Sequence, residues 1–598
     1  MNSNPPSIII ISPELVNDFK QHVIEDNWKW CFFGDDIALK EKLCSKLGYQ
    51  KNISYAKEMQ SISLAYKQSF LDWIASIGRM QAQSWWYGTN IAYKCPVSSN
   101  LFLNYCILLL IKKLIDQNAR KVVFIIENPK LGKSIEKNIG AKNILVKIHT
   151  YKVLKKIKYL LFGNIYIFLK DLYANVREAM EIYNKNKHLP KKYRYEVLNS
   201  LKGKIDILFA TWITPTQFNK NNDSFYDQYL GKLFEYYKKK KLDIKYINFG
   251  FINKYLMKQT LKSDEIIPID IFLGYKDIFK ALIVSSAIRW KSSIPRTHGL
   301  DLIDIFIDAR KNERRNVFHH YLYYLVIKKL IRSGALNFKN IVYPFENQPL
   351  DKMLIKAIHD ARLHPKIIGY QHGNMPYLLL NYFLGKNEKK EYPQPDYIFT
   401  CTGLYKRMLK KANYRSAIYN GGSISSRYKI SINNLKNDRG PENKNYTDIL
   451  ALLPGSIVDA KEMLFFLKRQ AGFNFLIKAH PILNEQMLKD TLQVIPGNFS
   501  FVNDPLESLY KKTDYVIYNS TLAGLESLLN GKIIIKYISE RIDLDPLLTH
   551  DINIPTLTFN STLDLNYLKN LKNSPIPKDL PLKEEIKYDL WDKIILTT

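Results

Sequence analysis

The sequence is poor in cysteine and has no long apolar segment. Its five cysteines are odd in number, lie far apart and form no metal-binding pairs, which argues against a disulfide framework and favours a reducing compartment. The longest apolar runs, near residues 106–110 and 159–168, are interrupted well before the ~20 residues that a membrane helix needs. The apolar run at residues 7–12 is too short for a signal peptide and has no basic lead. The sequence therefore predicts neither export nor insertion and favours a cytoplasmic location.

No nucleic-acid-binding module is visible either, although the net charge is +32. Lysine is abundant together with Asn, Ile and Tyr, as an AT-rich coding sequence would also produce. Residues 151–162 alternate basic and apolar side chains in the manner of an interfacial helix, and residues 237–241 add four lysines. These runs indicate either a peripheral contact with the inner face of the plasma membrane or solvated helix faces. No nucleic-acid partner is expected.

The chain is long enough, and apolar enough, for more than one core. It has 598 residues, of which 46% are hydrophobic, and one core rarely grows to that size. Apolar strands alternate with helical segments, which predicts an α/β fold of two Rossmann-like lobes, with helical insertions in the first lobe. We expect a mixed segment at 1–70, a first lobe at 71–390 and a second lobe at 391–598. The charged, proline-containing stretch 384–395 is the predicted linker.

Two turns in the last third of the chain have the layout of a phosphate site. The apolar strand 473–477 runs into a basic turn in which Pro481 holds His480 extended. The strand 515–518 runs into short polar residues suited to begin a helix, whose free N–H groups attract anions. The alternative is an ordinary turn and an ordinary cap. Together they predict a nucleotide pocket in the crevice of a parallel sheet. The expected donor-binding residues are Lys478, His480, Pro481, Asn519, Ser520, Thr521, Gly524 and Glu526, with Gly422 and Ser423 from a separate glycine turn.

The turn at His480 and Pro481, followed by the strand and helix through residues 520–526, resembles the C-terminal domain of bacterial surface-polysaccharide transferases of the GT-B fold. It is most similar to the CMP-sugar users, the sialyl-, polysialyl- and Kdo-transferases, with CDP-glycerol glycerophosphotransferases as more distant relatives. The resemblance implies a fold of the GT-B type, in which the lobe at 71–390 binds the acceptor and the lobe at 391–598 binds the nucleotide sugar. It implies that His480, Ser520 and Thr521 contact the phosphate and nucleotide of the donor. It also implies transfer of an acidic sugar from a CMP-activated donor to a glycan or lipid-linked acceptor of capsule or lipopolysaccharide.

Four short motifs spread over most of the chain resemble a less characterised bacterial group, the surface carbohydrate biosynthesis proteins. The first contains the adjacent Trp85 and Trp86, which are typical of a core and could alternatively stack on a sugar. The four motifs lie at residues 85–94, 227–231, 345–348 and 369–373.

Candidate catalytic groups follow three predicted strands of the first lobe. Asp227 comes after one strand and a polar loop, with Asp223 as the second choice, while Glu346 and His372 follow two later strands. A carboxylate beyond the carboxyl end of a strand is well placed to act as a general base. A Glu beside a His can remove a proton from a sugar hydroxyl, and the His can stabilise phosphate charge. The alternatives are an Asp that satisfies a helix dipole, a buried Glu paired with a lysine, and a His in a glycine turn.

Neither a cofactor nor a metal is expected. The Asp-x-Asp at residues 543–545 lies past the last predicted strands, and we interpret it as a loop. The leaving phosphate would then be stabilised by His480, by the helix that begins near Ser520 and by basic side chains. Three alternatives stay open. One is a glycerol- or polyol-phosphate transferase with a CDP donor, in which phosphorus is attacked instead of the anomeric carbon. Another is a non-catalytic basic protein that binds a membrane surface or nucleic acid. The third is a degenerate transferase that acts as an assembly partner.

Overall fold

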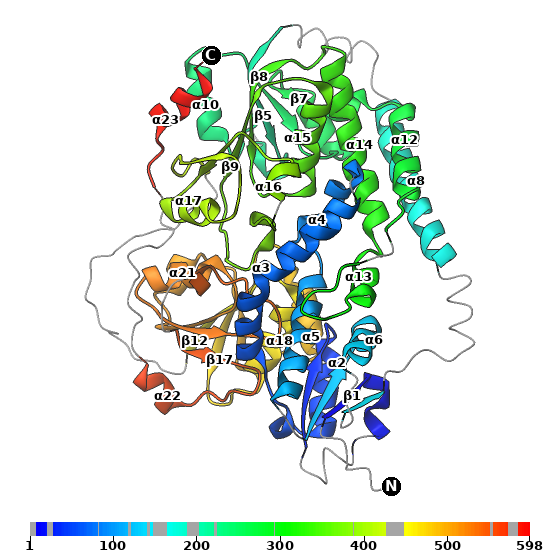
Figure 1. Cartoon of the computed structure of the whole chain (residues 1–598). Helices are drawn as coiled ribbons and strands as arrows, with labels where there is room; N and C mark the ends of the chain where they lie inside the picture. The colour runs from blue at the N-terminus through cyan, green and yellow to red at the C-terminus, as the bar shows by residue number, and fades with distance from the viewer. Residues whose placement is uncertain are drawn as a thin grey trace.

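In the computed structural model, the described strands form three sheets in which all neighbouring strands are parallel (Figure 1). We call them the N-terminal, middle and C-terminal sheets. The α/β class expected from alternating strands and helices is therefore confirmed, with three sheets where two were expected. The structure describes residues 8–18, 20, 28–81, 83–117, 121–139, 144–147, 164–187, 203–219, 224–291, 294–386, 388–425, 448–549, 554–571 and 584–597.

The N-terminal sheet has four strands in the order β2-β3-β1-β4. Side chains alternate between its two faces. Ile9 and Ile11 pack with the helix α2 on one face, whereas Ile8 and Ile10 join the core that α3 and α5 share on the other. The elements are β1 (Ile8–Ile11), β2 (Lys29–Phe33), α2 (Ile37–Leu47), α3 (Ala56–Gln81), α4 (Asn90–Tyr93), α5 (Leu101–Asp116), β3 (Val122–Ile126), α6 (Pro129–Asn138) and β4 (Ile144–Lys147).

The middle sheet has seven strands in the order β11-β10-β9-β8-β5-β6-β7. Counted along the chain from β5, this is the 3-2-1-4-5-6 order of dinucleotide-binding folds with one strand added at the edge. Its strands are β5 (Ile205–Thr211), β6 (Ile244–Asn248), β7 (Ile266–Ile267), β8 (Phe338–Pro344), β9 (Lys366–Gln371), β10 (Tyr397–Thr400) and β11 (Ala417–Asn420). Its helices are α8 (Asn164–Lys187), α10 (Gly231–Lys239), α11 (Lys254–Thr260), α12 (Tyr275–Ser286), α13 (Ile303–Ala309), α14 (Glu313–Arg332), α15 (Pro349–Ala361), α16 (Glu388–Glu391) and α17 (Gly403–Lys410).

The C-terminal sheet has six strands in the order β14-β13-β12-β15-β16-β17, again the 3-2-1-4-5-6 arrangement. The five or six parallel strands expected for this part of the chain are confirmed. The elements are β12 (Asp448–Leu452), α18 (Ile457–Lys468), β13 (Asn474–Lys478), α19 (Glu485–Leu492), β14 (Phe499–Phe501), α20 (Leu506–Leu509), β15 (Tyr515–Tyr518), α21 (Leu522–Leu529), β16 (Ile533–Tyr537), β17 (Thr556–Leu557), α22 (Leu565–Asn570) and α23 (Tyr588–Ile595).

Strand pairing corrects the expected division of the chain. β10 and β11 continue the middle sheet, because β10 pairs with β9 along residues 368–371. The boundary expected near residue 391 is therefore wrong, and the chain changes sheets between β11 and β12. The charged stretch 384–395 is not a linker between lobes: it connects β9 to β10 within the middle region, and most of its described residues are buried. Residues 1–70 likewise do not stand apart, because β1 and β2 pair with β3.

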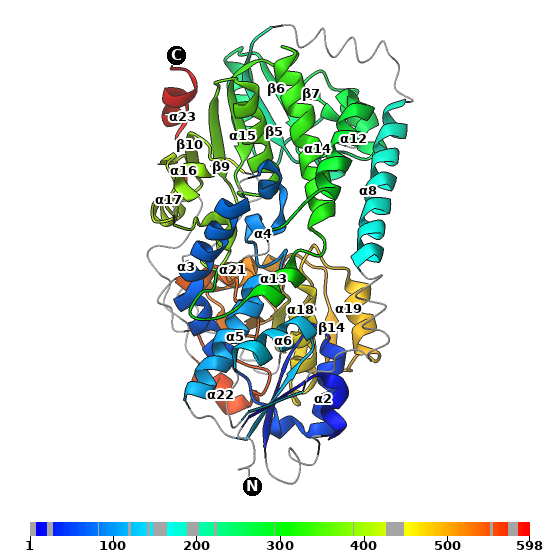
Figure 2. The same ribbon diagram turned by 45° about the vertical axis from the view of Figure 1, so that its right-hand side comes forward.

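In the view of Figures 1 and 2, the middle sheet lies above the N-terminal and C-terminal sheets, which lie side by side. The helix α3 runs from the lower two sheets towards the middle sheet. The last helix, α23, returns from the C-terminal sheet to the middle one. There the ring of Trp591 stacks on Phe399 at 3.9 Å, and its Nε1 donates to the carbonyl of Gly421 at 3.2 Å. Within the described part of the chain, no helix combines the length and apolar character needed to cross a membrane.

Candidate functional site

Two crevices are expected where the strand order of the large sheets reverses. Ligands of open parallel sheets bind beyond the carboxyl ends of the strands at such a reversal. The middle sheet reverses between β5 and β8, and the C-terminal sheet reverses between β12 and β15. The three predicted catalytic residues follow β5, β8 and β9, and most predicted donor residues follow β13 and β15. Both sets therefore lie at the carboxyl edges of their sheets, close to the two reversals.

Glu346 and His372 are in contact. The two residues follow β8 and β9, in which Pro344 pairs with Tyr370, so both side chains leave the sheet at the same level. Glu346 Oε1 lies 3.0 Å from His372 Nε2, and the Gln348 side-chain amide donates to Glu346 Oε2. The Glu346 side chain is 28% exposed and that of His372 is 9% exposed. The structure thus forms the Glu–His pair that the sequence predicts, with the carboxylate as the more accessible partner.

Asp227 lies beside this pair but is only 1% exposed. Its Oδ1 accepts the N–H of Tyr229 at 2.8 Å, and the ring of Tyr229 meets His372 edge-on at a centroid distance of 4.7 Å. Burial raises the pKa of Asp227 to about 6. The geometry suits a group that positions His372 better than one that touches an acceptor. Asp223 lies outside the described residues.

The turn after β8 is held in an unusual backbone conformation. Asn347 has a φ of +54°, a region that residues other than glycine seldom adopt. Its side-chain amide donates to the carbonyl of Asn381 at 2.5 Å and to the hydroxyl of Tyr414 at 3.1 Å, and Asn381 in turn donates to the carbonyl of Glu346 at 2.7 Å. Strained turns that the surroundings hold in place are common at functional sites. These bonds fix the direction in which Glu346 leaves the sheet.

A second buried carboxylate supports the same turn. Asp351 Oδ2 accepts the N–H groups of Glu346 at 3.1 Å and of Gln348 at 3.2 Å. Burial, together with the charge of Glu346, raises the pKa of Asp351 to about 8. At neutral pH this carboxyl group is therefore mostly protonated in the folded protein.

The variant Asp351→Asn is expected to change how stability depends on pH. The pKa of Asp351 is about 8 in the folded protein and ~3.9 in the unfolded chain. The protonated carboxyl group therefore contributes its full stabilisation below pH ~4, and this contribution is lost as the pH rises towards 8. In that window each pH unit costs the wild type about 1.4 kcal/mol. Asn keeps the two accepted N–H bonds and cannot ionise. Chemical denaturation should therefore find the variant close to wild type at pH 4 and more stable by a few kcal/mol at pH 8.

The matched control is Asp277→Asn. Asp277 holds the same position in the first turn of α12, where it accepts the N–H of Gly274, but it is partly exposed and pairs with Lys329. The control should not gain stability at pH 8. Parallel stability curves for Asp351→Asn and wild type between pH 4 and 8 would contradict the assignment.

At the other crevice, His480 lies against the turn after β12. A Cβ on Gly455 would stand 3.5 Å from His480 Nδ1 and 3.0 Å from Ile482 Cδ1. Burial lowers the pKa of His480, so its ring is neutral at pH 7. Its Nδ1 accepts the N–H of Ile482 at 3.3 Å, which places the ring proton on Nε2. His480 can therefore donate one hydrogen bond from Nε2 to a ligand.

The turn after β15 presents polar groups at the reversal itself. Thr521 caps α21 by accepting the N–H of Ala523 at 3.4 Å. Ser520 has a φ of +42°, and its hydroxyl donates to Asp543 at 3.2 Å. Asn519 is buried, yet its amide makes no hydrogen bond with the residues that the structure describes. Of the three predicted polar residues, Asn519 has the most freedom to bind a ligand.

The other four predicted donor residues near these turns have different surroundings. Lys478 Nζ donates to the carbonyl of Asp504 at 2.6 Å and so turns towards the loop after β14. A Cβ on Gly524 would stand 2.3 Å from the ring of Tyr518, so helix–strand packing requires this glycine. Burial and the neighbouring Glu507 raise the pKa of Glu526 to about 7. Pro481 is exposed and ends the His480 turn.

Gly422 and Ser423 do not belong with the donor residues. They follow β11 at the edge of the middle sheet, and the segment before α23 covers them. The N–H of Ser423 donates to the carbonyl of Glu584 at 2.9 Å, and a Cβ on Gly422 would stand 1.9 Å from the carbonyl oxygen of Glu585. This prediction was wrong because it assigned β10 and β11 to the C-terminal sheet.

The remaining motifs are part of the packing. Asp543 and Asp545 pair with the buried Lys536 at 2.5 and 2.8 Å. In the described residues, no cluster of three or more His, Cys, Asp or Glu side chains could hold a metal ion. Trp85 and Trp86 are buried and pack edge-on against Trp290, as the core interpretation expects.

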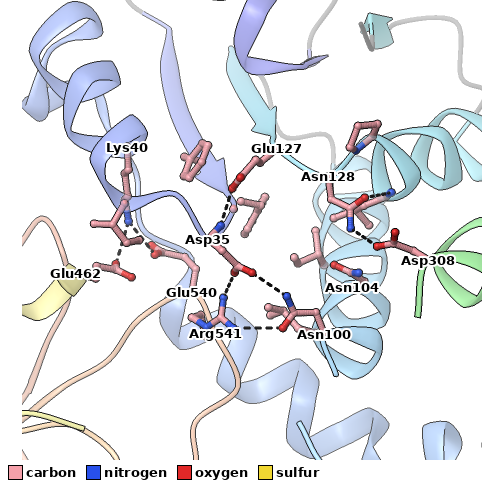
Figure 3. A pocket seen from close by; sticks show the side chains of 18 of the residues that line it. Asp35, Lys40, Asn100, Asn104, Glu127, Asn128, Asp308, Glu462, Glu540 and Arg541 are labelled. Carbon is pink, nitrogen blue, oxygen red and sulfur yellow. Dashed lines mark hydrogen bonds and ion pairs between the residues drawn. The ribbon is translucent and has the colours of Figure 1, made fainter. Parts of the chain in front are cut away.

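Sequence reasoning missed a cavity of about 410 Å³ between the N-terminal and C-terminal sheets (Figure 3). Its residues include Asp35, just after β2, and Arg541, just after β16. The pair Asp35-Asp36 at a strand end was the available signal. Several of the cavity's charged side chains form ion pairs between the N-terminal and C-terminal regions. The sequence does not reveal these pairs.

No protein-family model matches the chain, and no curated protein matches its sequence. Among solved structures, it is similar to UDP-N-acetylglucosamine 2-epimerase from Rickettsia bellii, at 10% identity and a TM-score of 0.30, over 59% of this chain and 84% of that one. It is also similar to MurG from Acinetobacter baumannii, at 11% identity and a TM-score of 0.28, over 61% of this chain and 89% of that one. A third similar structure is S. aureus MnaA in a co-structure with UDP, at 10% identity and a TM-score of 0.29, over 56% of this chain and 80% of that one. Likenesses this distant carry no information about the reaction.

Proposed function

We propose that the protein is a glycosyltransferase that binds a nucleotide-activated sugar at the C-terminal sheet and an acceptor hydroxyl at the middle sheet. The observation that carries the proposal is the contact of 3.0 Å between Glu346 and His372 at the reversal of the middle sheet. A carboxylate held by an imidazole, and still reachable from solvent, is suited to take a proton from a hydroxyl group.

The donor side of the proposal rests on neutral groups that favour phosphate. His480 offers one Nε2 proton, Asn519 has an uncommitted amide, and α18 and α21 begin beside them at Ser456 and Thr521. Helix N-termini and preorganised hydrogen-bond donors stabilise the charge of a leaving phosphate. This supports a nucleotide with its phosphate next to the reversal between β12 and β15.

In the proposed reaction, Glu346 takes the proton from the acceptor hydroxyl group, and the oxygen of that hydroxyl group attacks the anomeric carbon of the donor. The bond between that carbon and the phosphate oxygen breaks, and the nucleotide leaves with the electron pair. His372 holds Glu346 in place, and the buried Asp227 steadies His372 through Tyr229. The donor groups then bear the charge of the released phosphate.

The resemblance of the His480 and Ser520 turns to CMP-sugar transferases favours a CMP-activated acidic sugar and a glycan or lipid-linked acceptor of capsule or lipopolysaccharide. A CDP-dependent glycerol- or polyol-phosphate transferase is the second candidate, because it would use the same phosphate contacts. The two differ in what is attacked, the anomeric carbon or phosphorus.

The test is nucleotide release from a panel of CMP-, CDP-, UDP- and GDP-activated donors, with acceptor glycans present. Release of CMP from a CMP-sugar, lost in Glu346→Gln, supports the proposal. Release of CMP from CDP-glycerol supports the second candidate. Nucleotide binding without release from any donor would instead indicate a non-catalytic assembly partner and would overturn the transferase assignment.

A peripheral membrane contact is also proposed, on a surface that the sequence did not single out. Tyr275, Phe279 and Ile283 lie four residues apart on α12, and each is more than half exposed. The neighbouring α8 adds the exposed Leu169 and Tyr173 (Figures 1 and 2). Exposed lysines lie between them along both helices, at positions 170, 276 and 280. Apolar and aromatic side chains interleaved with lysine favour an anionic lipid surface.

The basic runs noticed in the sequence contribute less to this proposal. Residues 151–162 lie outside the described part of the chain. In the run 237–241, Lys238 forms an ion pair with Glu265 at 2.6 Å and Lys240 forms one with Asp592. The charges of these two lysines at the end of α10 are therefore already balanced by carboxylates.

The variant Phe279→Asp is expected to reduce sedimentation with vesicles that contain phosphatidylglycerol by about tenfold, because it places a charge within the apolar stripe of α12. Val494→Asp is the control, since Val494 is just as exposed but belongs to the C-terminal region. Vesicles of phosphatidylcholine alone should bind neither protein. Equal binding of wild type and Phe279→Asp would contradict the contact.

A further inference from the structure

The cavity between the N-terminal and C-terminal sheets has the construction of a binding site. It has a volume of about 410 Å³ and lies beyond the carboxyl ends of β2, β3 and β16, with α5 as one wall. Volumes of roughly 300–1,000 Å³ are usual for small-molecule sites. Figure 3 shows Asp35, Asn100, Asn104, Glu127 and Arg541 around this space.

The polar side chains of the cavity are held by one another. Asp35 pairs with Arg541 across the two sheets and accepts from Asn100 Nδ2 at 2.9 Å, while Arg541 donates to Asn100 Oδ1 at 3.3 Å. Glu127 Oε2 accepts the N–H groups of residues 35 and 36 at 2.6 and 3.1 Å. A Cβ on Gly34 would stand 2.2 Å from Glu127 Oε2, so glycine is needed there to admit the carboxylate. The arrangement is therefore preorganised.

One polar group in this wall has no partner. Asn104 is 6% exposed, lines the cavity, and its amide makes no hydrogen bond with the residues that the structure describes (Figure 3). The amide of Asn104 borders the cavity, so it can pair with a ligand that offers both a donor and an acceptor.

The charges of the lining restrict the ligand. Five carboxylates face three cationic side chains and three asparagines, so the site disfavours anions. Apolar side chains such as Phe32 and Ile107 complete the wall. Carboxylates and amides can form hydrogen bonds with the hydroxyl groups of a sugar ring, and the apolar side chains can contact its C–H groups.

We propose that this cavity binds an uncharged saccharide, with Asn104 and Asp35 bonded to its hydroxyl groups. The site is distinct from the Glu346–His372 pair and does not depend on the transferase reaction. It is connected to the donor crevice, because Arg541 Nε lies 3.8 Å from Asp459 in the first turn of α18. If the transferase assignment holds, a neutral sugar of the acceptor glycan is the natural occupant.

The test is ligand-observed saturation-transfer NMR with methyl glycosides of glucose, galactose and N-acetylglucosamine, and with glucuronate and sialic acid as anionic probes. Wild type should bind at least one neutral glycoside and neither anion. Asn104→Leu should weaken that affinity at least tenfold, and Asn104→Ala serves the same purpose if leucine prevents folding. The exposed Asn503→Leu is the matched control and should bind as wild type does.

His480→Ala separates this inference from the proposed function. It should abolish nucleotide binding and leave the neutral glycoside affinity unchanged. The saccharide site is refuted if no neutral glycoside binds, if only the anionic sugars bind, or if Asn104→Leu and Asn104→Ala both bind as well as wild type. None of these results would bear on nucleotide binding.

Discussion

Replacing Lys40 by methionine is expected to lower the free energy of unfolding by about 3–5 kcal/mol. Lys40 is buried on α2, and its Nζ pairs with Glu462 at 2.9 Å and with Glu540 at 3.2 Å. Burial alone would lower the pKa of this ammonium group, but the two carboxylates outweigh it and raise the pKa, so the lysine stays charged. Methionine keeps the volume and leaves two buried carboxylates without a counter-ion. Equilibrium denaturation at pH 7 measures the loss.

The control is Lys42→Met, on an exposed position of the same helix, which should change stability by no more than about 0.5 kcal/mol. The deficit of Lys40→Met should shrink at low pH, where the two carboxylates become protonated. Since Lys40 joins the N-terminal sheet to the C-terminal one, the loss also measures how firmly the two are coupled. Equal stabilities of the two variants would show that this ion triad does not hold the sheets together.

Replacing Glu346 by glutamine is expected to lower the turnover number by about 10²–10⁴-fold, the usual contribution of a general base. The amide has the shape of the carboxylate and retains one of the two oxygens that contact Gln348 and His372, but it cannot take the proton from the acceptor hydroxyl. The affinity for the nucleotide should be unchanged, because the donor groups lie at the other sheet. Steady-state kinetics with the donor identified by nucleotide release separates the two effects.

Glu136→Gln, on an exposed face of α6, is the control and should retain full activity. The melting temperature of Glu346→Gln should stay close to that of wild type. A folded Glu346→Gln variant with wild-type turnover would exclude this carboxylate as the base.

The local parts of this fold could be predicted from the sequence. Apolar runs marked many of the strands, although β2 lies in a segment that was expected to be helical. The polar residues at the strand ends indicated two sheet edges as sites. The contact of Glu346 with His372 followed from two neighbouring strands of equal register. Such predictions succeed because strand direction and the position of strand ends are properties of short segments.

Membership in a sheet could not be predicted in the same way. The run at β10 has the composition of any buried strand, and only its pairing with β9 shows that it belongs to the middle sheet. The error moved the expected boundary and misplaced Gly422 and Ser423. Gly524 shows a related limit, because a glycine required by the ring of Tyr518 has the same sequence signature as one required by a phosphate.

The cavity between the outer sheets was beyond sequence reasoning for a physical reason. Its ion pairs join residues that are remote in the chain, such as Lys40 and Glu540, which are 500 positions apart. Each residue alone resembles an ordinary surface charge on a lysine-rich protein. Only the packing of two sheets buries them together and leaves the amide of Asn104 without a hydrogen bond to the described residues.

The central claim, a nucleotide site at the reversal of the C-terminal sheet, is tested most directly by thermal unfolding with CMP, CDP, UMP, UDP and GDP. A ligand at 100 times its Kd stabilises a protein by about 2.7 kcal/mol. We predict that CMP raises the melting temperature of wild type and of the exposed control His364→Ala, and leaves that of His480→Ala unchanged. Stabilisation by UDP or GDP that depends on His480 would keep the site and discard the CMP donor. No stabilisation by any nucleotide, or stabilisation that survives in His480→Ala, would contradict the site.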